Sequence, residues 1–554
     1  MAAVNFQYTP FPEDPAEMVW HRLLCVAPAA VSWLVLLLLV VSSIAVPALG
    51  AAMIIAFLVF YIFRVAHNAL FLVISFLRVF AEERSDWLKR LEELSGVSLG
   101  AEQGLVSSIR TTRYGERLHA EVLASCRSRS EPVPDPRQLT HLVIIPVANE
   151  RRAVFEPGIR ALSKGILDPK RSLVVVLSVE ARSSAEVRAE VEDVRAAYAR
   201  YFRDFIVAVH PSDLAGEVPG KGSNVGYTAR AMADYFRQRS VSFDMVLLTC
   251  VDADALLNPS YFACLSYYFL AEPDRHRSCF QPLPVFSNNI WKTNALVRVL
   301  EMSQTIFQLV DSANVDMLVT FSCYSYSFQA LYESGFWPAD VIGEDAGVFW
   351  KTFMHFKGAF KAIPLPVTVT MDAPEGRTFW KTLRTAYRQK VRWAYGVENM
   401  AIVFRGLLRH RVVRGRRAWQ AALKFIDINL SQATWPFILS ILVWLPQATR
   451  LLSGMDPLPV FNLGRISSLI FQLSGVFLAL MVLITAFFAF RGAHGVPLWK
   501  KILYPLEWLL VFPISSILLG GAPAIHAQFM LAFNKPLVYV PMEKLRAGRT
   551  DTPP

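Results

Sequence analysis

The sequence predicts an α/β domain with a mostly parallel, Rossmann-like sheet, inserted between two groups of membrane-spanning helices. Of the 554 residues, 54% are hydrophobic and 18% are charged, a balance that lies between those of soluble enzymes and of membrane bundles. Long uncharged runs occur near both ends of the chain. The middle, about Leu77 to Arg417, has normal polarity and alternates short apolar strands with helical segments.

The first uncharged run covers residues 23–63. It is long enough for two crossings of roughly 20 residues each, with a turn near Pro47. The alternative is a cleaved signal peptide, but the acidic start (Glu13, Asp14, Glu17) lacks the usual basic region. We therefore predict a transmembrane hairpin in residues 1–80, followed by a helical linker in residues 81–138.

Later uncharged runs at 428–449, 466–490 and 508–534 predict transmembrane helices within residues 428–535. An amphipathic interfacial helix, Val412–Lys424, is expected before them within residues 405–427, and a cytoplasmic tail after them at 536–554. If the last run bends back at Gly520–Pro523, there are six crossings and both ends lie on one side. Without that bend there are five.

Orientation follows from the distribution of arginine and lysine. Six arginines lie between Arg405 and Arg417, whereas the turn near Pro47 has none. The positive-inside rule therefore predicts a multi-pass protein of the cell (inner or plasma) membrane with a cytoplasmic central domain. The net charge of +11 then indicates attraction to the lipid bilayer. It does not indicate nucleic-acid binding, because no basic patch is interleaved with aromatic residues.

The six cysteines are scattered without a Cys-x-x-Cys pair. This pattern predicts reduced thiols and favours neither a zinc site nor a disulfide.

Residues 139–404 form the predicted catalytic domain. Strands are expected at 141–145, 172–178, 205–209 and 245–248, with a helix at 185–201. Because these strands are almost continuously apolar, they predict a parallel sheet covered on both faces. Ligands bind at the carboxyl ends of the strands in such sheets.

Two carboxylates, Asp252 and Asp254, follow the fourth predicted strand. Carboxylates spaced in this way can both reach one hard divalent cation. Mg²⁺ or Mn²⁺ is expected, because either keeps positions open for the phosphate oxygens of a nucleotide. The alternative is a solvated loop or a helix cap. The position after a buried strand favours the metal site.

Two further motifs lie downstream. Asp345, next to Glu344, could serve as a general base or as a helix N-cap. If residues 387–395 are helical, Gln389, Arg392 and Trp393 share one face. There a guanidinium could bind a diphosphate and an indole could stack on a sugar ring. The alternative for this segment is a basic amphipathic helix at the membrane surface.

In this order, the three motifs resemble those of the membrane-embedded, inverting family-two glycosyltransferases, the group of cellulose, chitin and hyaluronan synthases. Asp252-Ala-Asp254, Gly-Glu344-Asp345 and Gln389-Lys-Val-Arg392-Trp393 are similar to the Asp-x-Asp, Thr-Glu-Asp and Gln-x-x-Arg-Trp motifs of that family. The resemblance covers roughly residues 142–395 and the flanking helices. It implies a GT-A fold and a nucleotide-sugar donor, with a UDP-sugar favoured.

The resemblance also implies roles for individual residues. Asp345 is the expected catalytic base, and Asp252 and Asp254 are the expected metal ligands. Four residues are expected at the diphosphate and acceptor: Glu344, Gln389, Arg392 and Trp393. Weaker matches at Pro146–Glu150 and Gly220–Asn224 complete a nucleotide-sugar-binding set of Glu150, Glu180, Lys221, Asn224 and Asp252.

The chain departs from the family pattern at three positions. Only Glu180 stands where the family usually carries aspartates that hold the base and ribose. Gly343 replaces the threonine of the Thr-Glu-Asp motif. Tyr324 replaces the glycine of the Cys-Gly-Ser stretch found in cellulose synthases.

The function that the resemblance implies is β-linked, processive polysaccharide synthesis with export through the membrane. One alternative is transfer of a single sugar to a polyprenyl phosphate or another lipid acceptor. The alternative from another class is a catalytically inactive scaffold or nucleotide sensor, which the missing aspartates near Glu180 motivate. The acceptor is thus a carbohydrate or a lipid-linked molecule, and the sequence does not identify a protein partner.

Overall fold

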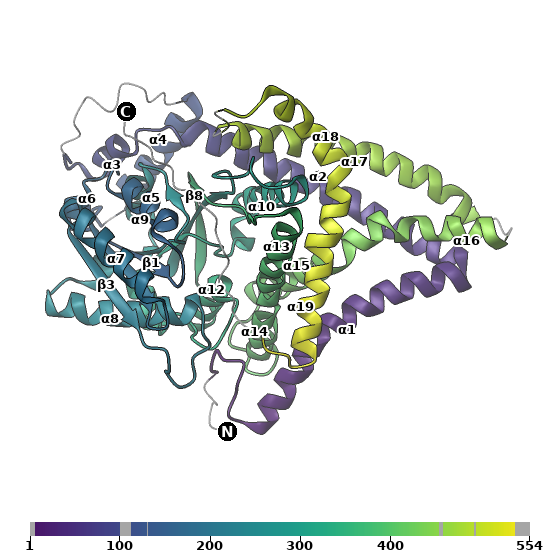
Figure 1. The fold of residues 1–554 in the computed structure, drawn as a ribbon, viewed down its shortest axis with the longest axis horizontal. Coiled ribbons are helices and arrows are strands. Elements are labelled where there is room, and N and C mark those ends of the chain that lie inside the picture. The colour runs from purple at the N-terminus through teal and green to yellow at the C-terminus, as the bar shows by residue number, and fades with distance from the viewer. Residues whose placement is uncertain are drawn as a thin grey trace.

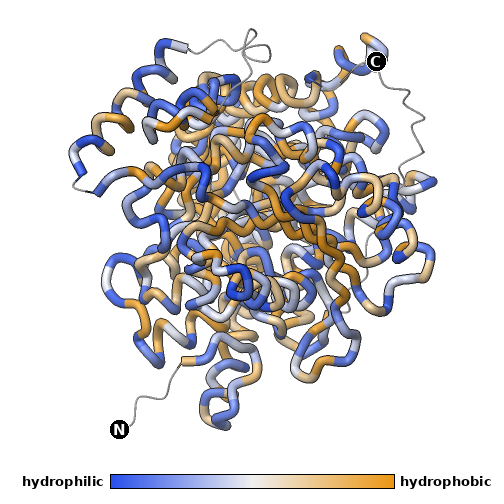
Figure 2. Tube along the Cα trace, turned by 90° about the vertical axis from the view of Figure 1, so that its left-hand side faces the viewer, coloured by the Kyte–Doolittle hydropathy of each residue, from blue (hydrophilic) through white to orange (hydrophobic). Residues whose placement is uncertain are grey.

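The computed structural model describes residues 6–99, 112–129, 131–453, 458–491, 493 and 495–537. A sheet domain lies at the left of Figure 1, and long apolar helices form a wedge to its right. Seen from the domain end, Figure 2 shows hydrophobic segments gathered in the middle and hydrophilic segments around them.

The N-terminal helices are α1 (Pro15–Ala45) and α2 (Pro47–Glu82). Each begins with a proline. Proline is favoured there because the N–H that it lacks would have no hydrogen-bond partner in the first turn of a helix. The Asp14 side chain accepts a hydrogen bond from Ala16 N and caps α1. Both helices are long and apolar enough to cross a membrane, as predicted.

The linker contains α3 (Trp87–Ser95) and α4 (Arg113–Arg127). Arg90 of α3 forms a buried ion pair of 3.1 Å with Glu82 at the end of α2, and donates to the Gly115 carbonyl oxygen at 2.7 Å. The linker is therefore attached to the long helix that precedes it.

The domain is built on an eight-stranded sheet of order β3-β2-β1-β4-β7-β6-β8-β5. The strands are β1 (Thr140–Val147), β2 (Leu173–Glu180), β3 (Asp204–His210), β4 (Val246–Cys250), β5 (Leu256–Leu257), β6 (Ser278–Val285), β7 (Tyr324–Ser327) and β8 (Lys361–Thr370). β1 pairs in parallel with β2 and β4, β2 with β3, and β6 with β8. β7 is antiparallel to both β4 and β6, and β5 is antiparallel to β8. The four predicted strands are confirmed, and so is the mostly parallel α/β class.

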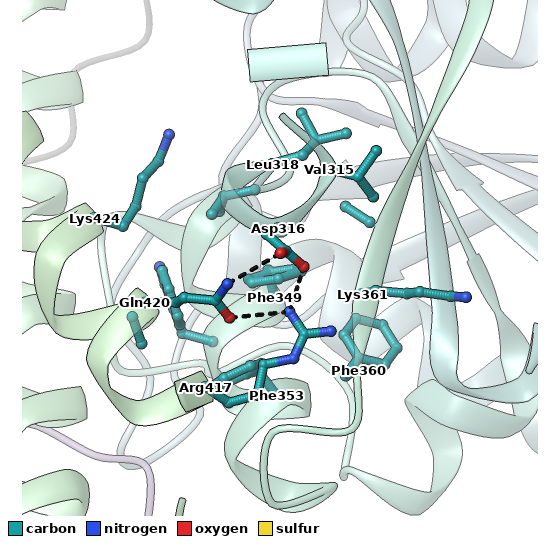
Figure 3. Close-up of a pocket in the computed structure, with 14 residues that line it drawn as sticks. Val315, Asp316, Leu318, Phe349, Phe353, Phe360, Lys361, Arg417, Gln420 and Lys424 are labelled. Atoms are coloured by element: carbon teal, nitrogen blue, oxygen red, sulfur yellow. Dashed lines mark hydrogen bonds and ion pairs between the residues drawn. The ribbon is translucent and has the colours of Figure 1, made fainter. Parts of the chain in front are cut away.

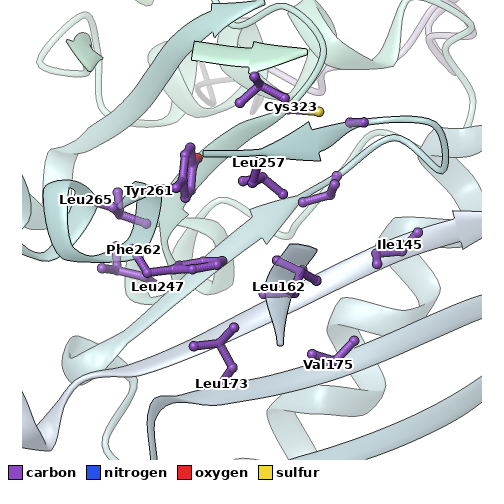
Figure 4. Packing of buried hydrophobic residues seen from close by; sticks show 14 of the residues in the cluster. Ile145, Leu162, Leu173, Val175, Leu247, Leu257, Tyr261, Phe262, Leu265 and Cys323 are labelled. Carbon is purple, nitrogen blue, oxygen red and sulfur yellow. The ribbon is translucent and has the colours of Figure 1, made fainter. Parts of the chain in front are cut away.

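The helices of the domain are α5 (Arg152–Leu162), α6 (Pro169–Ser172), α7 (Ala185–Tyr198), α8 (Lys221–Gln238), α9 (Tyr261–Ala271), α10 (Ala295–Ala313), α11 (Phe328–Glu333), α12 (Glu344–His355), α13 (Phe379–Ala394) and α14 (Glu398–Leu408). Several of them cover the two faces of the sheet. Figure 4 shows Tyr261, Phe262 and Leu265 of α9 and Leu162 of α5 against strand residues of the same cluster. A second cluster packs α8, α11 and α12 on the other face. This two-sided burial explains the continuous apolar strands.

The C-terminal region differs from the prediction at its start. A separate interfacial helix was expected at 412–424, but residues 409–415 form a turn and α15 (Arg416–Ser440) runs without a break into the apolar region. Gly415 adopts a positive φ of 65°, which separates α14 from α15. α15 continues through Leu442–Trp444 into α16 (Leu445–Ser453), with a bend of 44° between the two helices.

The last helices are α17 (Leu458–Arg491), α18 (Leu498–Ser515) and α19 (Ala522–Ala532). Six residues of π-helix, Ser516–Gly521, join α18 to α19, so Leu498–Ala532 is one helical run. The chain therefore does not bend back at Gly520–Pro523, as six crossings would have required, because the helix continues through both glycines as a π-helical turn. Among the described residues, four helices have the length and composition of a span, or up to five if the bent pair is one span. The predicted tail at 536–554 lies almost entirely outside the described residues.

Candidate active site

The carboxyl ends of β1, β2 and β4 open into a cleft that encloses about 1290 Å³ when its open, solvent-facing part is included. All of the residues singled out in the sequence line it: Glu150, Glu180, Lys221, Asn224, Asp252, Asp254, Glu344, Asp345, Gln389, Arg392 and Trp393. They come from segments up to about 240 positions apart. The fold therefore gathers the predicted residues around one cleft, at the edge of the sheet where ligands of such folds bind.

A lysine joins two of the carboxylates at the centre of the cavity. Lys221 Nζ lies 2.6 Å from Asp252 Oδ1 and 2.9 Å from Asp345 Oδ1. Burial alone would lower the pKa of Lys221, but the two carboxylates outweigh it and raise that pKa well above its ordinary value. The ammonium group is therefore charged, and it places Asp252 and Asp345 within reach of a single cation.

Asp345 is held from several sides. Tyr324 donates its hydroxyl hydrogen to Asp345 Oδ1 at 3.0 Å, and Trp337 Nε1 donates in turn to the Tyr324 oxygen at 3.0 Å. The Ser322 backbone N–H donates to Asp345 Oδ2 at 3.3 Å. Burial, and next the Asp345 carboxylate, raise the pKa of Tyr324 well above its ordinary value, so its hydroxyl remains a donor. Asp345 lies in the first turn of α12 and Gly343 occupies the N-cap position, so the N-cap alternative for Asp345 is wrong.

Ser322 has an unusual backbone for a residue with a side chain, with a φ of 52°. Its hydroxyl donates a short hydrogen bond to Asp252 Oδ2 while its N–H reaches Asp345. Non-glycine residues in the left-handed region cost free energy and cluster at functional sites. Ser322 thus holds both carboxylates at once from one strained position.

Asp254 lies deeper than Asp252 and is almost fully buried. Its Oδ2 accepts a hydrogen bond from the Asp372 backbone N–H at 3.1 Å. Asp372 follows β8 and also lines the cavity. The Asp254 side chain therefore fastens the end of β8 to the loop that follows β4.

Carboxylate oxygens are common ligands of Mg²⁺ and Mn²⁺, so the chemistry of Asp252 and Asp254 fits such an ion. Within the described part of the chain, no three His, Cys, Asp or Glu residues are grouped so as to hold a metal. In nucleotide sites, Mg²⁺ is usually bound by one or two carboxylates together with phosphate oxygens and water.

The three outer residues of the predicted nucleotide set make contacts within the protein. Glu150 Oε2 accepts from Ala148 N at 2.7 Å and holds the turn after β1. Glu180 Oε2 lies 3.2 Å from His210 Nδ1, and Asn224 Nδ2 donates to the Ser178 carbonyl oxygen at 3.0 Å. These contacts shape the wall of the cavity. Direct contact of these side chains with a donor stays a prediction.

Two glutamates lie where the loop before α12 leads into Asp345: half-buried Glu344 is the first residue of the helix, and buried Glu398 contacts the loop. Burial, and next the negative charge of Asp345, raise the pKa of Glu344 to about 7. The positive charges of Lys221 and Arg392 act in the opposite direction. Glu398 Oε1 accepts from the backbone N–H groups of Ile342 and Gly343, both at 2.7 Å. Burial raises the pKa of Glu398 to about 8, although these two hydrogen bonds act in the opposite direction.

The N-terminal segment supports the same loop. Tyr8 donates its hydroxyl hydrogen to Asn399 Oδ1 at 2.7 Å, and Asn399 Nδ2 donates to the Gly343 carbonyl oxygen at 3.1 Å. Buried Arg405 donates to the carbonyl oxygens of Gln7 and Thr9 at 2.8 and 2.9 Å. The chain just before the first apolar helix is thus packed behind the loop that presents Asp345.

Helix α13 forms another wall of the cavity, and its helical form was predicted. Gln389, Arg392 and Trp393 face the cavity from it. The Gln389 side-chain oxygen is buried and has no hydrogen-bond donor among the described residues. Lys390 Nζ lies 3.7 Å from the centre of the Trp393 ring, so the cation already covers part of the indole that was expected to stack on a sugar.

A second, smaller hollow of about 370 Å³ lies between α12 and the start of α15 (Figure 3). Asp316 accepts from Arg417 Nη1 at 3.0 Å and from Gln420 Nε2 at 3.0 Å across its mouth. None of the predicted site residues lines it. This hollow marks the seam where α15 is attached to the sheet domain.

Ser322, Asp372, Glu398 and the role of Tyr324 were missed in the sequence. Tyr324 was visible only as a departure from a family motif. Asp372 follows a strand that the sequence did not predict, and Glu398 acts through backbone groups that only the fold brings near it. An acidic residue after an unrecognised strand carries no local signal.

A curled, mostly parallel sheet with paired aspartates after β4 and an acidic residue at the start of α12 defines a glycosyltransferase domain of the GT-A class. Residues 247–519 match the model of glycosyl transferase family group 2. This region therefore belongs to a family-two glycosyltransferase, and that part of the predicted resemblance is confirmed.

Several solved structures are similar in fold. The mannosyltransferase PcManGT from Pyrobaculum calidifontis, in complex with GDP-Man and Mn²⁺, is 14% identical, with 69% of this chain and 96% of that chain covered at a TM-score of 0.38. TarS residues 1–349 from S. aureus are 13% identical, with 61% and 90% covered at a TM-score of 0.31. Glucosyl-3-phosphoglycerate synthase from Mycobacterium tuberculosis is 15% identical, with 54% and 84% covered at 0.28. No curated protein matches the chain. Because these likenesses are distant, the roles proposed below rest on this chain's own residues.

Proposed function

We propose that this glycosyltransferase is a membrane-bound, inverting enzyme that moves a sugar from a nucleoside-diphosphate sugar to a growing polysaccharide. A UDP-sugar is the favoured donor, and the catalytic domain faces the cytoplasm. The observation that carries the proposal is the convergence of Asp252 and Asp345 on one cation, Lys221 Nζ, in the cleft that all of the predicted site residues line.

In the proposed reaction, Asp345 accepts the proton of an acceptor hydroxyl. The hydroxyl oxygen forms a bond with the anomeric carbon while the bond from that carbon to the diphosphate breaks on the opposite face. One base and one displacement invert the configuration, so an α-linked donor gives a β-linked product. The hydrogen bond from Tyr324 orients Asp345 for this transfer.

Lys221 and Arg392 face the leaving group. With the donor diphosphate in the cavity, Lys221 exchanges part of its contact with Asp345 for the phosphate oxygens, which frees the carboxylate to take a proton. Asp252 and Asp254 would hold Mg²⁺ or Mn²⁺, whose charge offsets that of the departing diphosphate. Gln389, with an oxygen that lacks a donor in the described protein, offers an acceptor for a sugar hydroxyl.

The membrane location rests on the apolar helices at both ends of the domain and on the arginines between Arg405 and Arg417. Positive charge next to a span favours the cytoplasmic side. In the proposed arrangement, the nucleotide sugar binds to the catalytic domain from the cytoplasmic side, and the polymer leaves through the membrane. A carbohydrate chain, or a lipid-linked one, is the proposed acceptor.

The test is sugar transfer by membranes that contain the protein, with radiolabelled donors and with product length read on a gel. A ladder of long products is expected. Addition of a single sugar to lipid would show that the acceptor is a lipid and not a polysaccharide. No transfer with any donor would refute the enzymatic proposal.

The Asp345→Asn variant tests the proposed base. Transfer is expected to fall by about a hundred- to ten-thousand-fold, which is the usual contribution of general-base catalysis. Donor binding, measured by calorimetry, is expected to persist, because Asn keeps the shape of the side chain. The matched control is Asp213→Asn, which makes the same change on an exposed loop and should retain full activity. Wild-type turnover in Asp345→Asn would rule Asp345 out as the base.

A further inference from the structure

The last helical run, Leu498–Ala532, crosses its neighbours and does not run alongside them; we call it the crosswise helix. In Figure 1 it passes from top to bottom over the open side of the wedge made by α1 below and by α2 and α17 above. Along its length it touches α17 through α18, then α15 through its π-helical turn, and then α1 through α19. A helix that spans a bundle keeps the same neighbours from end to end, whereas this helix exchanges them.

Its two ends meet the ends of α17 and α1 that adjoin the catalytic domain. Trp508 packs with Phe488 near the carboxyl end of α17, where Trp291 of the domain donates to the Ala489 carbonyl oxygen at 2.9 Å. At the other end, Arg22 near the start of α1 donates to the Ala532 carbonyl oxygen at 2.9 Å. Both ends of the crosswise helix therefore lie on the domain side of the wedge.

One face of the crosswise helix is fixed to the catalytic domain. Arg298 of α10 forms an ion pair of 2.8 Å with Glu507, and Ser515 Oγ donates to the Leu296 carbonyl oxygen at 2.7 Å. Further along, α19 packs on α13, and the Tyr387 hydroxyl lies 3.2 Å from His526 Nδ1. The helix thus lies between the domain and the apolar helices.

The opposite face is apolar and exposed. Its residues recur every three or four positions and form one stripe: Leu498, Trp499, Ile502, Leu503, Leu506, Leu509, Leu510, Ile514 and Leu518. Ile502 is 63% and Leu510 is 67% exposed, whereas Tyr504 and Trp508 on the other side are fully buried. An exposed apolar stripe of this size would favour aggregation in water, so we expect another molecule to cover it.

Two features identify the cover as lipid. The stripe continues the exposed apolar surface of the neighbouring candidate spans, on which Leu469, Leu473 and Leu483 of α17 are also exposed. Lys500 and Lys501 lie in the first turn of the helix, next to the start of the stripe, and Lys535 follows the helix. Cations therefore lie at both ends, where they can meet anionic headgroups. Apolar residues toward acyl chains and cations toward headgroups are the pattern of a helix lying in a membrane interface.

We propose that the crosswise helix lies in the membrane leaflet next to the catalytic domain, with its apolar stripe against acyl chains, and that it does not cross the bilayer. The inference rests on the membrane location proposed above. The chain then crosses four times, through α1, α2, the bent pair α15 and α16, and α17. The crosswise helix is accordingly the surface by which α10 and α13, and with them the Gln389–Trp393 wall of the active site, are seated on the membrane.

The test is the labelling of single cysteines by a membrane-impermeant maleimide in intact and in opened cells. The positions are Pro497 and Asn534 at the two ends of the crosswise helix, Val46 between α1 and α2, and Ser212 in the catalytic domain. All six native cysteines are buried, which keeps the background low. Pro497→Cys and Asn534→Cys are expected to react only after opening, as Ser212→Cys does, whereas Val46→Cys reacts in intact cells.

The labelling results distinguish a wrong position of the crosswise helix from a wrong membrane arrangement of the whole protein. If Val46 and Ser212 label from opposite sides but Pro497 and Asn534 do not both follow Ser212, the crosswise helix is a span and the inference is overturned. If Val46 and Ser212 label from the same side, the proposed membrane arrangement itself fails.

A second measurement addresses the lipid contact. Spin labels at Leu506 and Leu510 are expected to relax faster with oxygen, which concentrates in acyl chains, than with a water-soluble nickel complex. The control label at Ser212 should show the reverse order. A reverse order at Leu506 and Leu510 would show that water, not lipid, covers the stripe, and would overturn the proposed surface.

Discussion

At the scale of single residues, Tyr324 was noted in the sequence only because it replaces the glycine of a motif that the segment resembles, yet it contacts the centre of the site. Its ring is buried between the sheet and Trp337, and its hydroxyl meets the carboxylate proposed as the base. A glycine could not make this contact. The hydrogen bond therefore fixes the orientation of the Asp345 carboxylate in the cavity.

The Tyr324→Phe variant should therefore lower kcat by about tenfold to a hundredfold, the usual cost of a lost hydrogen bond to a charged group. KM for the donor should stay near the wild-type value, because the ring remains in place. Steady-state kinetics give both quantities.

Tyr326→Phe is the matched control for Tyr324→Phe. Tyr326 lies on the same strand and is equally buried, but its hydroxyl contacts Thr320 Oγ1 at 3.2 Å and not Asp345. The Tyr326→Phe variant should leave kcat near the wild-type value. An unchanged kcat in Tyr324→Phe as well would remove the assigned role of the hydroxyl.

At the scale of elements, α10 and α13 are joined by a buried ion pair behind the active-site wall. Lys390 Nζ lies 2.8 Å from Glu301 Oε1, and both side chains are inaccessible to water. Burial raises the pKa of Glu301 and lowers that of Lys390, which their mutual attraction opposes. Each of these buried charges is stabilised mainly by its partner, because no water is present to solvate it if the partner is removed.

The Lys390→Met variant should lower the free energy of unfolding by about 3–5 kcal/mol, because Glu301 remains buried without its cation. The double variant, in which Glu301→Met is added, should recover most of that loss, since the pair is replaced by apolar side chains of similar volume. Thermal unfolding in detergent measures both. If the double variant is as unstable as the single one, the loss comes from packing and not from charge.

At the scale of the whole molecule, stability depends on pH through a carboxyl group that stays protonated in the fold. The folded-state pKa of Glu398 is about 8 against an ordinary value of 4.5, so between these values the native state holds a proton that the unfolded state has released. Its contribution to stability is fully present below about pH 4.5 and is lost as the pH rises to about 8. The maximum slope is about 1.4 kcal/mol per pH unit.

The Glu398→Gln variant should flatten this dependence and should be more stable than the wild type at pH 8. Its side-chain oxygen can still accept from the N–H groups of Ile342 and Gly343, but it has no proton to lose. Chemical unfolding at several pH values measures the slope. The exposed Glu186→Gln is the control and should leave the slope as it is in the wild type. An unchanged slope in Glu398→Gln would place the pH dependence elsewhere.

The sequence by itself determined the elements whose causes are local. The apolar strands before Asp252 and Glu180, the helix that carries Gln389, Arg392 and Trp393, and the long uncharged runs all follow from periodicity, length and charge. The motif order was enough to identify the family. Each of these signals lies within one short segment, so no tertiary contact was needed to read it.

Only the tertiary structure decided how distant segments meet. It pairs β7 antiparallel between β4 and β6, places Tyr324 and Ser322 on Asp345, and packs Tyr8 behind the loop that carries Asp345. It also turns an apolar run that has the composition of a membrane span across its neighbours. Composition measures how apolar a helix is but not its direction, because direction depends on which surfaces the rest of the chain presents to it.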